Sequence, residues 1–142
     1  MPSLWLVPVD GSQASLRAVD HVVQEVLGDT TALEVVLVNV QPPLPSDVTR
    51  FVSSAVVHDY HREKGEAALA DARAKLEAAG VAYSHHILVG EPAPTIVDFA
   101  RENSCMLIVM GARGLGTVAG VLLGSVTQRV VHLTDLPVVV VK

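Results

Sequence analysis

The residues best suited to chemistry in this sequence form a glycine-rich stretch near its end. Gly111, Gly114 and the pair Gly124-Ser125 are separated by two and by nine residues. Glycines let backbone amides approach an anion without a Cβ in the way, and a helix N-terminus adds unpaired N–H donors and the positive end of its dipole. Arg113 could pair with a phosphate or lie over a ribose. The stretch therefore predicts a phosphate cradle.

Two familiar phosphate-binding motifs do not account for this stretch. Residues 114–119, GLGTVA, match the dinucleotide fingerprint, but that fingerprint belongs to a first strand and needs an acidic residue about 20 residues further on. Here the strand that follows is VVVVK at the end of the sequence. The P-loop motif requires a lysine, and none lies between Lys75 and Lys142. The longer Gly, Gly, Gly-Ser spacing remains the better interpretation.

The elements that must position this stretch alternate along the chain. Short apolar runs predict five strands, at residues 4–9, 33–40, 81–89, 105–110 and 138–141. Apolar residues at helical spacing predict four helices, at residues 14–27, 48–79 and 94–103 and around Val126, Val130 and Leu133. Such alternation implies right-handed crossovers and a doubly wound parallel sheet with helices on both faces.

In doubly wound sheets, ligands bind beyond the carboxyl ends of the strands, where the strand order reverses. That edge should gather Asp10 and Gly11 after the first strand and the residues near Asn39 and Val40 after the second. The glycine-rich stretch follows the fourth strand. We therefore expect these segments to form one ligand site.

Length, charge and cysteine content exclude several classes of function. The 142 residues, half of them hydrophobic, fit a single domain spanning 1–142. Ten basic and fifteen acidic residues give a net charge of −5, which argues against nucleic acid as a partner. No apolar run approaches the roughly 18 residues of a membrane span, and the start, MPSLWLVPVDG, does not resemble an export signal. With Cys105 as the only cysteine, a reducing cytoplasm fits best.

Several motifs together make the sequence similar to the universal stress protein family, in the branch that binds ATP. Residues 110–114, MGARG, and residues 124–127, GSVT, resemble its nucleotide signature. PVDGS at 8–12, GEP at 90–92 and LPVVVV at 136–141 resemble its opening strand, third strand-to-helix turn and final strand. The similarity covers essentially the whole chain. It implies a Rossmann-like fold of the adenine nucleotide alpha hydrolase type.

The resemblance implies a role for each matching residue. The adenine and ribose would meet Asp10 and Val40, with Pro8 and Val9 beneath them. The ribose and α-phosphate would follow Met110, Gly111, Arg113 and Gly114. The β- and γ-phosphates would be held through amides and hydroxyls of Gly124, Ser125, Val126 and Thr127. Mg²⁺ or Mn²⁺ would accompany the triphosphate.

The resemblance also implies a homodimer formed through Val138–Val141, and a short all-valine edge strand is on physical grounds a template for pairing. One departure from the family pattern is Met106, where an acidic residue is common. We expect it to alter packing at the start of its strand, on the far side from the nucleotide.

The motif places no carboxylate or histidine to activate water at a γ-phosphate. We therefore expect a dimeric stress-response or regulatory protein that holds ATP or another adenine nucleotide, with at most slow hydrolysis. One alternative is a nucleotide-hydrolysing or nucleotide-transferring enzyme of the related α/β superfamily, in which residues 42–56 would form a substrate lid. Another is a nucleotide-free dimeric adaptor, against which the intact signature counts.

Two residues of the predicted site could instead have a structural role, as caps of helices. Asp10 could merely cap the first helix, and Ser125 is expected to cap the last one.

The histidines and the cysteine suggest no site of their own. His58 and His61 fit a solvated helix face better than a metal site, since no third ligand is placed beside them. His85 and His86 are adjacent on a strand and must point to opposite faces. Cys105 opens a buried strand and is expected to be a small core residue.

Overall fold

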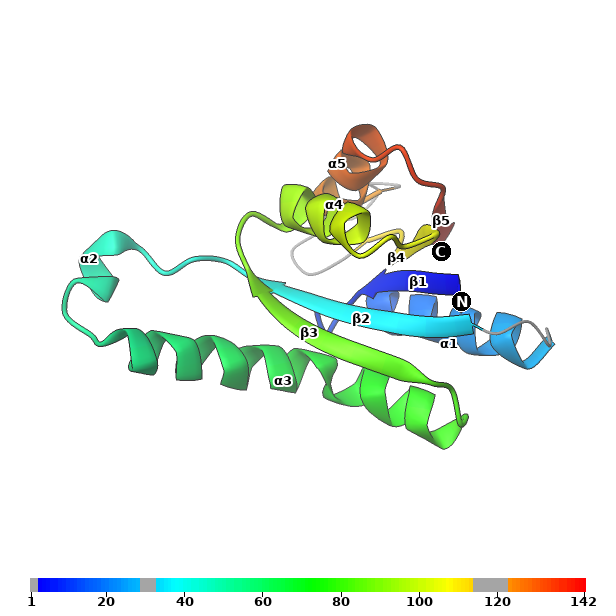
Figure 1. Ribbon diagram of the computed structural model, residues 1–142, viewed down its shortest axis with the longest axis horizontal. Coiled ribbons are helices and arrows are strands. Elements are labelled where there is room, and N and C mark those ends of the chain that lie inside the picture. Colours follow the sequence, from blue (N-terminus) through cyan, green and yellow to red (C-terminus); the bar gives the residue numbers. More distant parts are fainter. Residues whose placement is uncertain (1–2, 29–32, 114–122) are drawn as a thin grey trace.

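The computed structural model describes residues 3–28, 33–113 and 123–142. Its strands are β1 (Ser3–Pro8), β2 (Leu33–Gln41), β3 (Tyr83–Val89), β4 (Leu107–Gly111) and β5 (Val138–Val141). Its helices are α1 (Gln13–Gly28), α2 (Ser46–Thr49), α3 (Ser54–Ala78), α4 (Pro92–Glu102) and α5 (Ser125–Leu133). The strands form one parallel sheet (Figure 1), which confirms the predicted fold class.

The strand order β3-β2-β1-β4-β5 places the point of reversal between β1 and β4. From β1 the chain moves outward to β2 and β3, and it then returns to the other side of β1 to form β4 and β5. The predicted site therefore has a defined place, at the carboxyl ends of β1 and β4.

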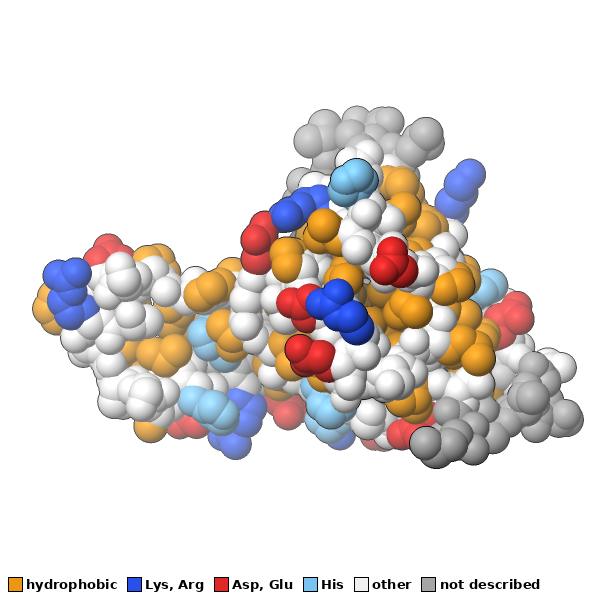
Figure 2. All heavy atoms as spheres, turned by 45° about the horizontal axis from the view of Figure 1, so that its top comes forward, with side chains coloured by type: hydrophobic (Ala, Val, Ile, Leu, Met, Phe, Trp, Pro, Cys, Tyr) orange, Lys and Arg blue, Asp and Glu red, His pale blue; other side chains and the backbone are white. Residues whose placement is uncertain are grey.

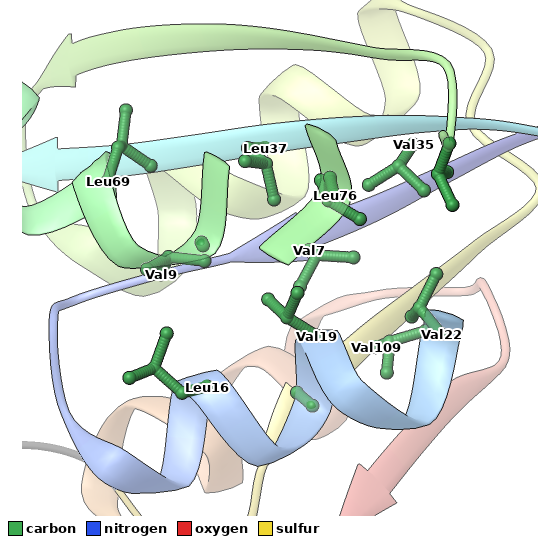
Figure 3. Close-up of a cluster of buried hydrophobic side chains, with 13 residues drawn as sticks. Val7, Val9, Leu16, Val19, Val22, Val35, Leu37, Leu69, Leu76 and Val109 are labelled. Atoms are coloured by element: carbon green, nitrogen blue, oxygen red, sulfur yellow. The ribbon is translucent and has the colours of Figure 1, made fainter. Parts of the chain in front are cut away.

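The core consists of two layers, one on each face of the sheet. On β2, Val35 and Leu37 pack toward α1 and α3, whereas Val36 and Val38 pack toward α4 and α5. Figure 1 shows these two pairs of helices on opposite faces, and Figure 3 shows the side chains of the first layer pointing toward one another. The run of Val and Leu in β2 is continuous because both faces are covered.

The predicted helix at 48–79 is wrong in its first part, because the chain forms two helices there. The hydroxyl of Ser53 accepts a hydrogen bond from the amide of Val56 at 3.2 Å, so α3 has a capped start of its own. Burial along α3 begins only at His61, and no residue of α2 is buried.

The segment from α2 through the first turns of α3 projects past the sheet as an arm (Figures 1 and 2). Its exposed large apolar side chains are Val48, Phe51, Val52, Val56 and Tyr60. Within the described residues, the model contains no helix that is long and apolar enough to cross a membrane.

Helix α1 lies unusually close to the end of β4. A Cβ added to Gly111 would stand 2.5 Å from the carbonyl oxygen of Ala14 and 2.9 Å from its Cβ. Glycine at this position is therefore required by packing, in addition to any role in binding a ligand.

We predict that Gly111→Ala destabilises the protein, because the methyl group must push α1 away from β4. The expected loss in the free energy of unfolding is about 1–3 kcal/mol, as for other overpacked sites. Urea unfolding followed by circular dichroism measures it. Gly28→Ala is the matched control, since nothing lies within 4 Å of its added Cβ. A Gly111→Ala protein as stable as this control would contradict the packing account.

Candidate functional site

The carboxyl end of β1 is tied to β2 by backbone and side-chain hydrogen bonds. The amide of Val9 donates to the carbonyl of Val38 at 2.8 Å, and the side-chain amide of Asn39 donates to the carbonyl of Val9, also at 2.8 Å. The chain then turns at Gly11, whose φ of +87° lies in the left-handed region that favours glycine. These contacts place Asp10, half-buried, at the point where the strand order reverses.

Asp10 holds this turn, and Ser12 caps the helix that follows. One carboxylate oxygen of Asp10 accepts from the amide of Ser12 at 2.9 Å. The hydroxyl of Ser12 accepts from the amide of Ser15 at 3.2 Å, which is the bond of an N-cap residue. The interpretation of Asp10 as the cap of α1 is therefore wrong by two residues.

The start of α5 is anchored to the end of β4. The amide of Gly124 donates to the carbonyl of Ala112 at 2.7 Å, and the hydroxyl of Thr127 donates to the carbonyl of Gly111 at 3.0 Å. Thr127 is buried, with 4% of its surface exposed. Its hydroxyl, expected at a phosphate, thus has a structural partner in the carbonyl of Gly111.

The first turn of α5 has the form of an anion site. Gly124, in extended conformation, takes the N-cap position, so the prediction that Ser125 caps this helix is wrong. The first amide to bond back within the helix is that of Gln128, which donates to the carbonyl of Gly124 at 3.0 Å. The amides of the first turn, at residues 125–127, have no carbonyl within the helix to pair with. They are the donors that an anion would meet.

The remaining predicted residues occupy different depths at this edge. Val9 and Met110 are buried in the two core layers, Val9 toward α1 and Met110 toward α4. Pro8 and Val40 are half-buried, and Arg113 is exposed. The prediction for Gly114 falls outside the described residues.

Sequence reasoning missed two roles at this edge. Ser12 was not recognised as the cap of α1, although serine is a favoured N-cap residue at the start of a helix. Gln41 donates its side-chain amide to the side-chain carbonyl of Asn39 at 2.6 Å, which links two polar side chains at the end of an apolar strand.

The histidines divide between the surface and the interior. His58 is exposed as predicted, but His61 is buried, and its Nε2 lies 3.1 Å from the carbonyl oxygen of Pro42. The prediction of a solvated face is therefore wrong for His61. No group of three His, Cys, Asp or Glu side chains suited to a metal ion occurs among the residues that the structure describes.

The other predicted orientations are confirmed. His85 lies 3.9 Å from Glu66 on α3, whereas the ring of His86 lies 5.1 Å from that of Phe99 on α4, so the two histidines point to opposite faces. Cys105 is a buried core residue, and burial raises the pKa of its thiol.

Met106 lies at the amino end of β4. It is exposed, and its amide bonds the carbonyl of Leu4 at 2.8 Å. The edge that carries Asp10 and the start of α5 lies at the other end of the strands, so Met106 is far from the candidate site.

Comparison with known proteins agrees with this geometry. Universal stress protein MJ0531 of Methanocaldococcus jannaschii is 35% identical over 140 residues, which cover 96% of this chain and 80% of that protein. The structure of hypothetical protein MJ0577 superposes with a TM-score of 0.83 at 30% identity and covers 100% of this chain and 96% of its own.

A universal stress protein solved in complex with cAMP has a TM-score of 0.73 at 29% identity and covers 99% of this chain and 97% of its own. The model of the universal stress protein family matches residues 5–142. The chain therefore belongs to the universal stress protein family.

Proposed function

We propose that this protein binds an adenine nucleotide, in the first place ATP, at the carboxyl edge of β1 and β4. The observation that carries the proposal is the first turn of α5, whose amides follow the anchored Gly124 and face no carbonyl of their own helix. The neighbour solved with cAMP supports an adenine ligand, as do more distant neighbours of the same fold solved with AMP and dAMP.

The site has two chemically different ends. On the β1 side, the carboxylate of Asp10 can accept a hydrogen bond from a ribose hydroxyl beside Val40, with Pro8 and Val9 beneath. On the β4 side, the phosphates would follow Met110, Gly111, Arg113 and Gly114 to the first turn of α5, at residues 124–127. Because the described residues offer no metal cluster, Mg²⁺ or Mn²⁺ would arrive with the triphosphate.

We propose binding rather than rapid turnover as the function, in a regulatory protein of the cytoplasm. A buried free cysteine such as Cys105 suits a reducing compartment. An enzyme of the related superfamily would release many product molecules per protein chain, above the background rate. A nucleotide-free adaptor would be purified with no adenine nucleotide bound. Protein purified without added nucleotide, then denatured and assayed for adenine compounds, separates the adaptor from the other two, and a multiple-turnover assay separates those.

We predict that Ser125→Asp weakens ATP binding while leaving the fold intact. The new carboxylate at the first position of α5 repels the phosphates, which lowers affinity about tenfold to a hundredfold at a few ångströms of separation. The same charge interacts well with the helix dipole, so thermal stability should be unchanged or slightly higher. Isothermal calorimetry with MgATP and a thermal melt measure both effects.

Two controls isolate the charge effect. Ser54→Asp adds a carboxylate at the same position of α3, on the arm, and should leave ATP affinity unchanged. Adenosine has no phosphates and should bind Ser125→Asp as it binds the natural protein. If Ser125→Asp binds ATP as tightly as the Ser54→Asp control, the phosphates do not sit at α5.

We also propose a homodimer through β5. The carbonyls of Pro137 and Val141 accept from the amides of Ile108 in β4 and of Ala112 just after it, so these alternate positions face β4. Since alternate residues of a strand present their backbone groups to opposite sides, Val138 and Val140 present theirs to the open edge. A second copy could add its β5 there.

Val140→Pro tests this edge directly. Proline removes only the outward N–H and is tolerated on an edge strand at such a position, so the β4–β5 ladder should survive. We expect the natural protein and Val140→Ala to have twice the chain mass in light scattering, and Val140→Pro to be a monomer. A folded Val140→Pro that remains a dimer would place the contact elsewhere.

A further inference from the structure

Three polar groups at the carboxyl ends of β1 and β2 are joined in series. The side-chain amide of Asn39 donates to the backbone carbonyl of Val9, and its side-chain carbonyl accepts from the side-chain nitrogen of Gln41. The distances are 2.8 and 2.6 Å. Asn39 and Gln41 are two residues apart on one strand, so both project from the same face of the sheet.

This series fixes the orientation of each amide. The carbonyl of Val9 can only accept, so Asn39 must turn its NH₂ group toward it. The side-chain carbonyl of Asn39 then faces Gln41, which must donate to it from its own NH₂ group. Rotating the Gln41 amide by half a turn would set two carbonyl oxygens against each other. The remaining end of the Gln41 amide is therefore always the acceptor Oε1.

The surroundings hold this arrangement in place. Asn39 is buried, with 4% of its surface exposed, so its hydrogen bonds have little competition from water. The backbone of Gln41 is fixed as well, because its carbonyl accepts from the amide of Gly90 at 3.0 Å. The Gln41 side chain is half-buried and projects from the face of the sheet opposite to that of Val40. Through Asn39 it is joined to the Val9 carbonyl, which directly precedes Asp10. It thus offers a held acceptor at the β1 side of the proposed site.

We propose that Gln41 selects a purine that carries an amino group at its sixth position, with Asn39 as the residue that orients it. This inference rests on the proposed nucleotide site. Adenine has a donor at that position and would donate to Oε1 of Gln41. Guanine and hypoxanthine have a carbonyl oxygen there, and two acceptors would meet with no donor between them. Gln41 cannot adapt by rotating, because Asn39 holds its NH₂ group.

The test compares MgATP with MgITP, which differ in the group at the sixth position of the base and in the proton on the adjoining ring nitrogen. We expect the natural protein to favour ATP. Gln41→Leu should reduce the ratio of the two affinities about tenfold, the effect of one hydrogen bond lost and one mismatch removed. Gln24→Leu, at an exposed position on α1, is the matched control and should keep the natural ratio.

Asn39→Leu tests the orienting role separately. This variant keeps Gln41 but frees its side-chain amide to rotate. The affinity for ITP should therefore rise relative to that for ATP, even if the lost bond to Val9 lowers the melting temperature. If Asn39 had a purely structural role, its loss would weaken the binding of both nucleotides equally and leave the ratio of the two affinities unchanged. That result would overturn this part of the inference.

The failures are distinguishable. If the natural protein binds ATP and Gln41→Leu keeps its preference over ITP, the inference about Gln41 is wrong and the proposed function stands. If the natural protein binds neither nucleotide, the proposed function fails and the inference fails with it.

Discussion

The contact between the end of β4 and the start of α5 is the constraint on which the candidate site depends. The carbonyls of Gly111 and Ala112 accept from the Thr127 hydroxyl and the Gly124 amide, so these bonds hold the first turn of the helix at the carboxyl end of β4. The same glycine admits α1, since any side chain there would strike Ala14. Two helix starts thus converge on one residue, which makes Gly111 a packing requirement as well as part of a sequence motif.

This convergence explains how a chain with a net charge of −5 could hold an anion. In the proposed site, the positive field would come from backbone amides and from Arg113, so it would not depend on the overall charge. The carboxylate of Asp10 holds the turn that follows β1. With aromatic residues at only 4% of the chain, an adenine ring would lie against aliphatic side chains and backbone, and its identity would be read by amides such as that of Gln41.

The sequence predicted the sheet well because each strand is a short apolar run whose covering on both faces leaves a local signal. The final strand, Val138–Val141, has the predicted bounds. Errors arose where the outcome depends on contacts between distant residues or on one cap. The break before α3 depends on the Ser53 hydroxyl within a charged, alanine-rich pattern, and the burial of His61 depends on the Pro42 carbonyl 19 residues away. The link from Asn39 to Val9 spans 30 residues, so no local motif could indicate it.

In the function that we propose, an adenine nucleotide lies at the carboxyl edge of the sheet, between Asp10 and the first turn of α5. Titration of ¹⁵N-labelled protein with MgATP, followed by amide chemical shifts, tests it at every residue. We expect saturable shifts concentrated at Gly11, at 111–113 and at 124–127, with those around Cys105 at the opposite edge unchanged. The absence of saturable shifts, or shifts confined to the edge around Cys105, would contradict it.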